Sequence, residues 1–221
     1  MAAADPVGVI AVRLARGAID AAVQRRRFSP PSQSIPPQLR AEGGVFVTLT
    51  THPQAQLRGC IGYPEPVMPR IEALLDAAVS AALHDPRFPP VRPEELAALR
   101  VEVTLLSVPE LLIGTSADRA PSDLGVVPLL AETQRPTLPS LIRVGTDGLI
   151  VEHSARRGLL LPQVAPEQGW DVLELLGGTC RKAGLPPDAW QRAGCVLWRF
   201  QGTIFEEVTP GGDVHARPAG S

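Results

Sequence analysis

The sequence predicts an α+β fold, with a mainly antiparallel sheet and packed helices in a compact single domain of two pseudo-repeated halves. The first reason is periodicity: segments with an apolar residue at every second position alternate with segments whose apolar residues recur at helical spacing. The second is order, because a β-hairpin, a helix and a strand follow one another twice along the chain. The third is composition: 221 residues with 44% hydrophobic and 20% charged residues can bury a core without disulfide or metal staples.

The first expected element is a helix near the N-terminus. Asp5 can cap it, and Pro6 fits its first turn. An apolar stripe at helical spacing follows over residues 7–22. The segment "SPPSQSIPP", residues 29–37, then predicts an extended connector, because proline interrupts both helices and central strands.

The stretch "VFVTLTTHPQAQLRGCIG", residues 45–62, predicts a β-hairpin whose loop lies at "HPQAQ". Residue parity places Arg58 and Cys60 together on the polar face of the second strand. A symmetric loop puts Thr50 opposite Arg58 and Thr48 opposite Cys60. The thiol is therefore expected among polar side chains.

The remaining elements complete the first half and repeat its plan in the second. They are a helix from Pro69 to "DPRFPP", a strand at 99–107, a hairpin at 148–162, a helix between Asp171 and Gly184, and a strand at 195–208. Arg58-Gly59 in the first hairpin matches Arg157-Gly158 in the second. We expect the apolar faces of both hairpins to share one core.

Domain boundaries follow from this plan, with residues 1–221 expected as one domain. Its parts are a first half at about 1–110, a variable proline-rich connector at 114–140, a second half at about 141–208 and a flexible tail at 209–221.

The main candidate for chemistry is Cys60, and the alternative is that it packs as a small buried hydrophobe. A neighbouring guanidinium, that of Arg58, favours thiolate over thiol. Gly59 and Gly62 let another backbone or a ligand approach closely. Leu159 occupies the matching position in the second half, which indicates a single site on a pseudo-symmetric scaffold.

Four further residues are candidates for binding a ligand or supporting the site. Asp85 and Arg87 can pair with each other, clamp a loop, or bind a ligand, and the structural roles are favoured. Glu102 lies on the polar side of its strand and can orient Arg58 or Arg87. Gln163 is expected to line a cleft between the two halves.

No metal site is predicted, and the identity of any cofactor stays open. His52, His84 and His153 show no HxH, HExxH or CxxC spacing with Cys60. Whether Cys60 pairs with His52 or His84 as a nucleophile and base stays open, because spatial closeness decides it.

Several conspicuous residues favour ordinary structural roles. Trp170 and Trp190 are expected to pack, since no basic stripe surrounds them. Cys180 falls on the apolar stripe of its helix. The net charge of −2 gives no electrostatic footprint for nucleic acid, so the arginines at 25–27 are expected at a solvated helix end.

The cysteine count and the apolar runs bear on the compartment. Three cysteines without a CxxC motif indicate neither a disulfide framework nor a zinc ribbon, which favours a reducing cytoplasmic environment. No apolar run approaches the roughly 20 residues that a bilayer requires. Charged residues interrupt any signal-peptide core near the N-terminus.

Five blocks of sequence carry a resemblance to a known family. In order they are "LRGCIG", "DPRFPP", "VEVTLLSVPE", "GLLLPQVAPEQGWD" and "CRKAGLP". Together they resemble the AMMECR domain family, named for a chromosomal region linked to Alport syndrome, mental retardation, midface hypoplasia and elliptocytosis. Prokaryotic members are often named AmmeMemoRadiSam system protein A. The segment at 114–140 departs from the family by being longer and richer in proline.

The resemblance implies a compact α+β fold without a Rossmann or P-loop site, and a family without a firmly assigned reaction. It also implies two companions, a Memo-like protein similar to extradiol dioxygenases and a radical SAM protein. The interpretation we favour is an accessory or binding protein with a ligand cleft at the LRGCIG motif. The alternative is a thiol-dependent enzyme or group carrier that uses Cys60; oligomeric state is not predicted.

Overall fold

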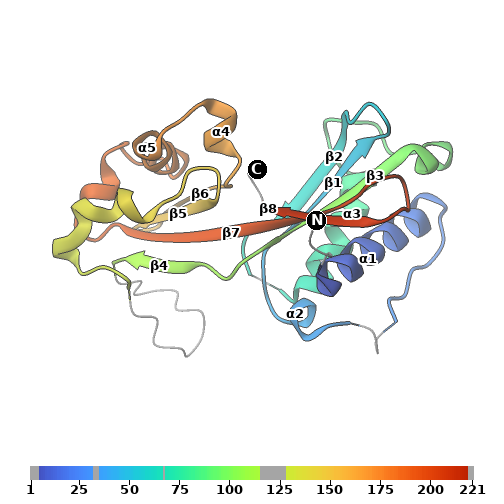
Figure 1. Ribbon diagram of the computed structural model, residues 1–221, viewed down its shortest axis with the longest axis horizontal. Coiled ribbons are helices and arrows are strands. Elements are labelled where there is room, and N and C mark those ends of the chain that lie inside the picture. Colours follow the sequence, from blue (N-terminus) through green and yellow to red (C-terminus); the bar gives the residue numbers. More distant parts are fainter. Residues whose placement is uncertain (1–4, 32–34, 67, 115–127, 219–221) are drawn as a thin grey trace. The chain divides into compact units, whose positions relative to one another are not determined.

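The computed structural model describes residues 5–31, 35–66, 68–114 and 128–218. The fold is α+β, with antiparallel strands and packed helices as predicted (Figure 1). The chain divides into two compact units. The first is Met1–Val108 with Thr203–Arg217, and the second is Pro109–Gly202 with Pro218–Ser221.

The first unit contains two long helices and an antiparallel sheet. Its elements are α1 (Pro6–Val23), α2 (Pro37–Arg40), β1 (Val45–Thr51), β2 (Leu57–Tyr63), α3 (Arg70–Leu83), the 3-10 helix η2 (Pro93–Ala98), β3 (Leu99–Leu106), the end of β7 (Val196–Glu207) and β8 (Val214–Pro218). The strand order is β2-β1-β3-β7, and β8 pairs with β7. The edge strand β2 therefore carries the LRGCIG motif.

Helices α1 and α3 cover one face of this sheet. The Asp5 carboxylate accepts a hydrogen bond from the Val7 N–H at 3.0 Å and caps α1, as the sequence predicts. Alternate residues of β1 and β3 pack against the helices, while the intervening residues face the opposite way. The buried strand residues on the helix side are Val45, Val47, Leu49, Leu99, Val101 and Val103.

The pairing of β1 with β2 confirms one predicted contact and corrects another. Thr48 lies opposite Cys60, as predicted. Thr50 lies opposite Leu57 rather than Arg58, because a β-bulge shifts the register after Leu49. A bulge places two residues of one strand against one of its partner, so Arg58 has no direct cross-strand neighbour.

The second unit repeats the hairpin, helix and strand of the first. Its elements are β4 (Glu110–Ile113), the 3-10 helix η3 (Glu132–Leu141), β5 (Asp147–His153), β6 (Arg156–Leu160), α4 (Val164–Gln168), α5 (Val172–Lys182), the 3-10 helix η4 (Ala189–Gln191) and the first part of β7. The pairing β6-β5-β7 reproduces the pairing β2-β1-β3.

One glycine in each hairpin allows the helix to pack on the outer strand. A Cβ at Gly59 would collide with the carbonyl oxygen of Ala81 in α3. A Cβ at Gly158 would collide with the backbone of Thr179 and Ala183 at the end of α5. The predicted match of Arg58-Gly59 to Arg157-Gly158 therefore has a physical basis in helix–strand packing.

Each unit has its own hydrophobic cluster, so the expectation of one core shared by the two hairpins is wrong. Val45 and Val47 belong to the first cluster with α1 and α3, whereas Leu149 and Val151 belong to the second with α5. Each hairpin buries its apolar face against the helix of its own unit.

Two expected irregular segments contain regular structure. Residues 209–217, expected as a flexible tail, include most of β8, which pairs with β7. The expected connector at 114–140 includes all but the last residue of η3, where the buried Arg135 side chain donates to Glu132 and to the Trp190 carbonyl. Part of that connector, residues 115–127, lies outside the described residues.

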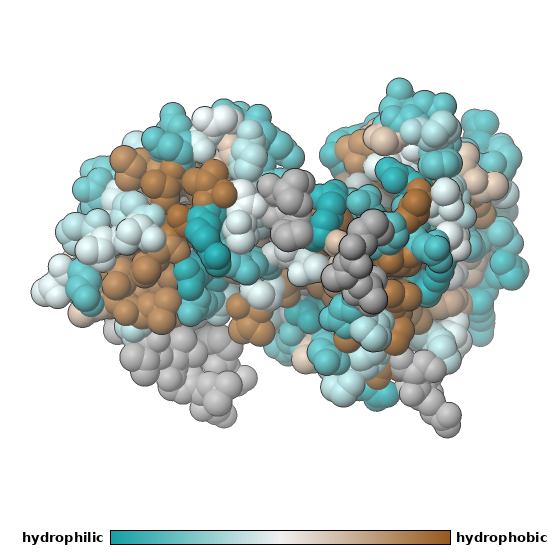
Figure 2. Space-filling model, viewed as in Figure 1, coloured by the Kyte–Doolittle hydropathy of each residue, from teal (hydrophilic) through white to brown (hydrophobic). Residues whose placement is uncertain are grey.

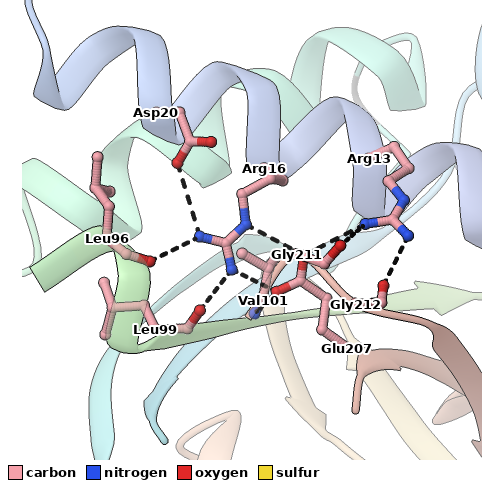
Figure 3. Close-up of polar contacts among 9 residues, drawn as sticks. All are labelled: Arg13, Arg16, Asp20, Leu96, Leu99, Val101, Glu207, Gly211 and Gly212. Atoms are coloured by element: carbon pink, nitrogen blue, oxygen red, sulfur yellow. Dashed lines mark hydrogen bonds and ion pairs between the residues drawn. The ribbon is translucent and has the colours of Figure 1, made fainter. Parts of the chain in front are cut away.

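A buried ion pair joins α1 to the end of β7 in the first unit (Figure 3). The fully buried Glu207 carboxylate accepts hydrogen bonds from the Arg16 guanidinium and from the Val101 N–H. Arg16 also donates to the carbonyl oxygens of Leu96 and Leu99. Every group in this cluster has a partner, which is how charges are tolerated in a protein interior.

Candidate functional site

The backbone of Cys60 is held by two side chains from the segment after α3. The Asp85 carboxylate accepts a hydrogen bond from the Cys60 N–H at 2.8 Å, and the Arg87 guanidinium donates to the Cys60 carbonyl at 3.1 Å. Arg87 also donates to Asp85 at 2.7 and 3.0 Å. We call Asp85 and Arg87 the clamp. Of the roles open to them, the structure supports pairing with each other and gripping the hairpin.

The electrostatics of the clamp favour a permanently charged pair. Asp85 is 4% exposed, whereas the Arg87 side chain is 53% exposed. Hydrogen bonds from Arg87 hold the pKa of the Asp85 carboxyl well below its ordinary value, against the opposing effect of burial. The same ion pair raises the pKa of Arg87. The clamp therefore stays charged across the physiological pH range.

The Cys60 side chain lies on the sheet face opposite α1 and α3, in a row with Thr48 and Glu102. Thr48 is the cross-strand partner of Cys60 on one side and of Glu102 on the other. The Thr48 hydroxyl donates to the Cys60 sulfur at 3.3 Å. We call Cys60, Thr48 and Glu102 the polar row. All three are half-buried, and the Thr48 hydroxyl is the polar neighbour that the structure shows for the thiol.

Glu102 has charged neighbours on three strands. Arg217 of β8 donates to Glu102 at 3.2 Å and to Glu206 of β7 at 3.1 Å. Burial raises the pKa of Glu102, and the repulsion of Glu206 acts in the same direction. Arg217, Arg100 and the Thr48 hydroxyl oppose that rise without cancelling it. Glu102 thus keeps its proton to higher pH than an ordinary glutamate.

Two expected side-chain contacts are corrected. Arg58 binds Glu95 of η2 through two hydrogen bonds, at 2.9 and 3.2 Å, instead of lying beside the Cys60 thiol. Glu102 orients neither Arg58 nor Arg87, since its ionic partner is Arg217. The bulge explains the first change, because it removes Arg58 from the regular alternation that parity assumes.

Gly59 and Gly62 support the site by making room for the protein itself. Gly59 admits the backbone of α3, and Gly62 admits the ring of Phe46 from the neighbouring strand. Gln163 lies elsewhere in the chain, just before α4 in the second unit. Its expected place in a cleft stays a prediction.

Within the described ranges, no three side chains of histidine, cysteine, aspartate or glutamate gather in a way that could hold a metal ion. His84 is the C-cap of α3, and His52 precedes a cis-proline in the hairpin loop. Cys180 and Cys195 are both fully buried. Burial raises the pKa of the Cys180 thiol, and it raises that of Cys195 to about 12.

The second unit carries a shallow groove of about 500 Å³ beside α5. Figure 2 shows apolar side chains exposed in this part of the unit, where Leu173 is 52% exposed. The charged groups of the groove already have partners: Asp171 and Glu174 cap α5, and Arg181 lies over the ring of Trp170. Trp170 also packs across Gly178, as the packing role predicted for it requires.

The sequence reasoning missed three residues of the site region. Glu95 and Arg217 were missed because each lies far along the chain from its partner and carries no local signal. Thr48 was placed opposite Cys60 but not recognised as its hydrogen-bond partner. The pairing of a hydroxyl with a thiol across two strands is the signal that could have identified it.

Comparison with known proteins identifies the family. The AMMECR1 family model matches residues 12–205, which include the clamp and the polar row. The chain belongs to the AMMECR1 family. A protein of Thermofilum pendens is 46% identical over 218 residues, with 95% of this chain and 94% of that protein covered. A protein of Methanothermobacter thermautotrophicus is 50% identical over 196 residues, covering 89% and 92%.

A solved structure has the same fold as this chain. The crystal structure of the uncharacterized protein PH0010 from Pyrococcus horikoshii superposes with a TM-score of 0.73 at 43% identity, and 98% of each chain is covered. No helix in the described part of this AMMECR1 chain has the length and apolar character needed to cross a membrane.

Proposed function

We propose that this AMMECR1 protein is an accessory binding protein whose first hairpin presents Cys60 to a ligand or partner. The clamp carries the proposal. Asp85 and Arg87 fix both backbone polar groups of Cys60, and the thiol lies among polar groups. Supporting the backbone around one side chain is what a binding site requires, because the side chain must be held in place.

The second unit offers a contrast that favours this proposal. Leu159 follows Gly158 as Cys60 follows Gly59, and it pairs with Ile150 as Cys60 pairs with Thr48. The first hairpin thus presents a thiol beside a hydroxyl where the second presents two apolar side chains.

The partners proposed are the two companions that the family resemblance implies, a Memo-like protein and a radical SAM protein. An affinity-tagged chain expressed in its native host should recover at least one of them. Cys60→Ala should reduce the recovery at least tenfold, whereas the matched variant Leu159→Ala should not. Recovery of neither companion by the folded wild-type protein would contradict the accessory role.

A second candidate function is a thiol-dependent enzyme or group carrier. The observation that favours it is the hydrogen bond between Thr48 and the Cys60 sulfur, since a buried packing cysteine needs no polar partner. In this case a small electrophile should modify Cys60 in the folded protein, while Cys180 and Cys195 react only after denaturation. Equal protection of all three thiols would exclude it.

A further inference from the structure

The polar row places a thiol, a hydroxyl and a carboxyl in sequence across three adjacent strands, from β2 through β1 to β3. The hydroxyl lies between the other two groups. It donates to the sulfur at 3.3 Å, and Glu102 is its cross-strand partner on the other side. A hydroxyl has one proton to donate and two lone pairs to accept with, so it cannot donate to both neighbours at once.

The direction of this hydrogen-bond chain therefore depends on where the mobile proton is. When Glu102 is ionised, the Thr48 hydroxyl donates to the carboxylate and accepts from the Cys60 S–H. When Glu102 is protonated, its O–H donates to Thr48, and Thr48 donates to the sulfur. The second arrangement has the hydroxyl direction found in the structure, and it suits a thiolate as the acceptor.

We propose that the Thr48 hydroxyl is a proton path between the Cys60 thiol and the Glu102 carboxylate. One proton moves from the sulfur to the Thr48 oxygen while the Thr48 proton moves to Glu102. The electron pair left on the sulfur then forms a bond to an electrophilic carbon, while the bond from that carbon to its leaving group breaks and the leaving group departs with that bond's electron pair. This inference rests on the proposed thiol chemistry, and it assigns Glu102 as the proton acceptor that the sequence does not reveal.

The surroundings of Glu102 suit that role. Arg217 and Arg100 are the cations that face it, and Glu206 is the other carboxylate. Arg217 is shared between the two carboxylates, so its charge is only partly available to hold Glu102 in the ionised form. Burial raises the pKa of Glu102 towards that of a thiol, which reduces the free-energy cost of the transfer.

Two charged side chains contact the backbone of Cys60. Arg87 donates to its carbonyl oxygen. Asp85 lies at its N–H but is already neutralised by Arg87. The carboxylate on the other side of the Thr48 hydroxyl is thus the candidate acceptor for the thiol proton.

Alkylation by iodoacetamide tests the path, because the carbon–sulfur bond forms as iodide leaves and the thiol proton must go elsewhere. The rate at Cys60 is followed by mass spectrometry from pH 4 to 9 in the full chain. The wild type should show two rises in rate, one with the ionisation of Glu102 and one with that of the thiol. Thr48→Val should lose the first rise and react roughly tenfold more slowly at neutral pH, since a hydrogen bond to the developing charge is lost.

Two further variants make the result decisive. Thr48→Ser keeps the hydroxyl and should keep both rises, while Glu102→Gln should lose the first. If the alkylation rate of Thr48→Val still shows the first rise with pH, Glu102 influences the thiol by its charge alone, and the path is refuted. A single rise in the alkylation rate of the wild type refutes the path as well. If iodoacetamide does not label Cys60 below pH 9, the proposed thiol chemistry is refuted together with the path. Capture of the companions is a separate measurement, so it tests the accessory role independently of these outcomes.

Discussion

At the scale of single residues, the clamp and the polar row contact different parts of Cys60. Asp85 and Arg87 bind its backbone, whereas Thr48 contacts its sulfur. A substitution in the clamp should therefore affect the position of Cys60, whereas a substitution of Thr48 should affect the reactivity of its thiol. Loss of the clamp should alter stability first, and loss of Thr48 should alter thiol chemistry first.

The clamp predicts a dependence of stability on acidity. Because the Asp85 pKa lies below its unfolded value of 3.8, the folded state binds fewer protons, and the carboxylate stabilises the fold at neutral pH. This contribution, about 2 to 3 kcal/mol by comparison with similar buried carboxylates, should be lost as the pH falls below about 4. Urea denaturation of the wild type and of Asp85→Asn between pH 2 and 7 measures it.

The asparagine variant should be less stable at pH 7 and should lack the decline in acid. Asp188→Asn is the matched control, because Asp188 pairs with Arg192 at an exposed site where solvent screens the interaction. A decline of equal steepness in Asp85→Asn and wild type would assign the acid sensitivity to other groups.

Residue parity predicted the face of Cys60 and the contact with Thr48, because both depend only on alternation along a strand. It failed for Arg58, since a bulge is a local insertion that breaks alternation and "LRGCIG" gives no sign of it. The clamp could be suspected from the motif "DPRF", but its grip on Cys60 joins residues 25 positions apart and depends on where α3 ends.

At the scale of elements, the same helix-on-hairpin packing is built twice around a glycine. Gly59→Ala should push α3 away from β2, and Gly158→Ala should push α5 away from β6, because backbone atoms occupy the space of each new methyl group. Each substitution should lower the free energy of unfolding by about 1 to 3 kcal/mol. Chemical denaturation followed by circular dichroism checks both.

Gly177→Ala provides the control for glycine substitution in general. Its Cβ would lie 3.4 Å from Pro187, an ordinary contact, and alanine favours the helix. This variant should gain up to about 1 kcal/mol. If Gly59→Ala leaves the free energy of unfolding unchanged, α3 can shift at little cost and the glycine match between the halves is accidental.

The sequence predicted the hairpin, helix and strand of both halves, since each has a long and strongly periodic pattern. It did not predict η3 or β8. The first contains Pro136 and Pro139, which normally argue against a helix, and the second is a short segment with charged residues. Both are fixed by tertiary partners, Trp190 for η3 and β7 for β8.

At the scale of the whole molecule, the first unit is discontinuous in sequence. It needs residues 203–217 from the far end of the chain, and the ion pair of Arg16 with Glu207 lies where that segment meets α1. Sequence patterns describe neighbours along the chain, so the return of the C-terminal segment could not be predicted from them.

Breaking this ion pair should cost more than most substitutions. Arg16→Met leaves the buried Glu207 carboxylate with only the half-exposed Arg13 guanidinium, 3.9 Å away, as a counter-ion, which should lower the free energy of unfolding towards the lower end of about 3 to 5 kcal/mol in urea denaturation. The double variant with Glu207→Gln removes the stranded charge but keeps an acceptor for the Val101 N–H, so it should recover part of the loss. A double variant less stable than Arg16→Met would contradict this explanation.

The clamp has one more consequence, for how copies of the chain behave in concentrated solution. The outer strand of a sheet exposes unpaired N–H and C=O groups on which a second chain can add a strand, and such contacts lead to aggregation. In β2 those groups of Cys60 are occupied by Asp85 and Arg87. The thiol-bearing strand thus remains at the border of its sheet, and the charged pair that fixes it also keeps neighbouring molecules from extending the sheet there.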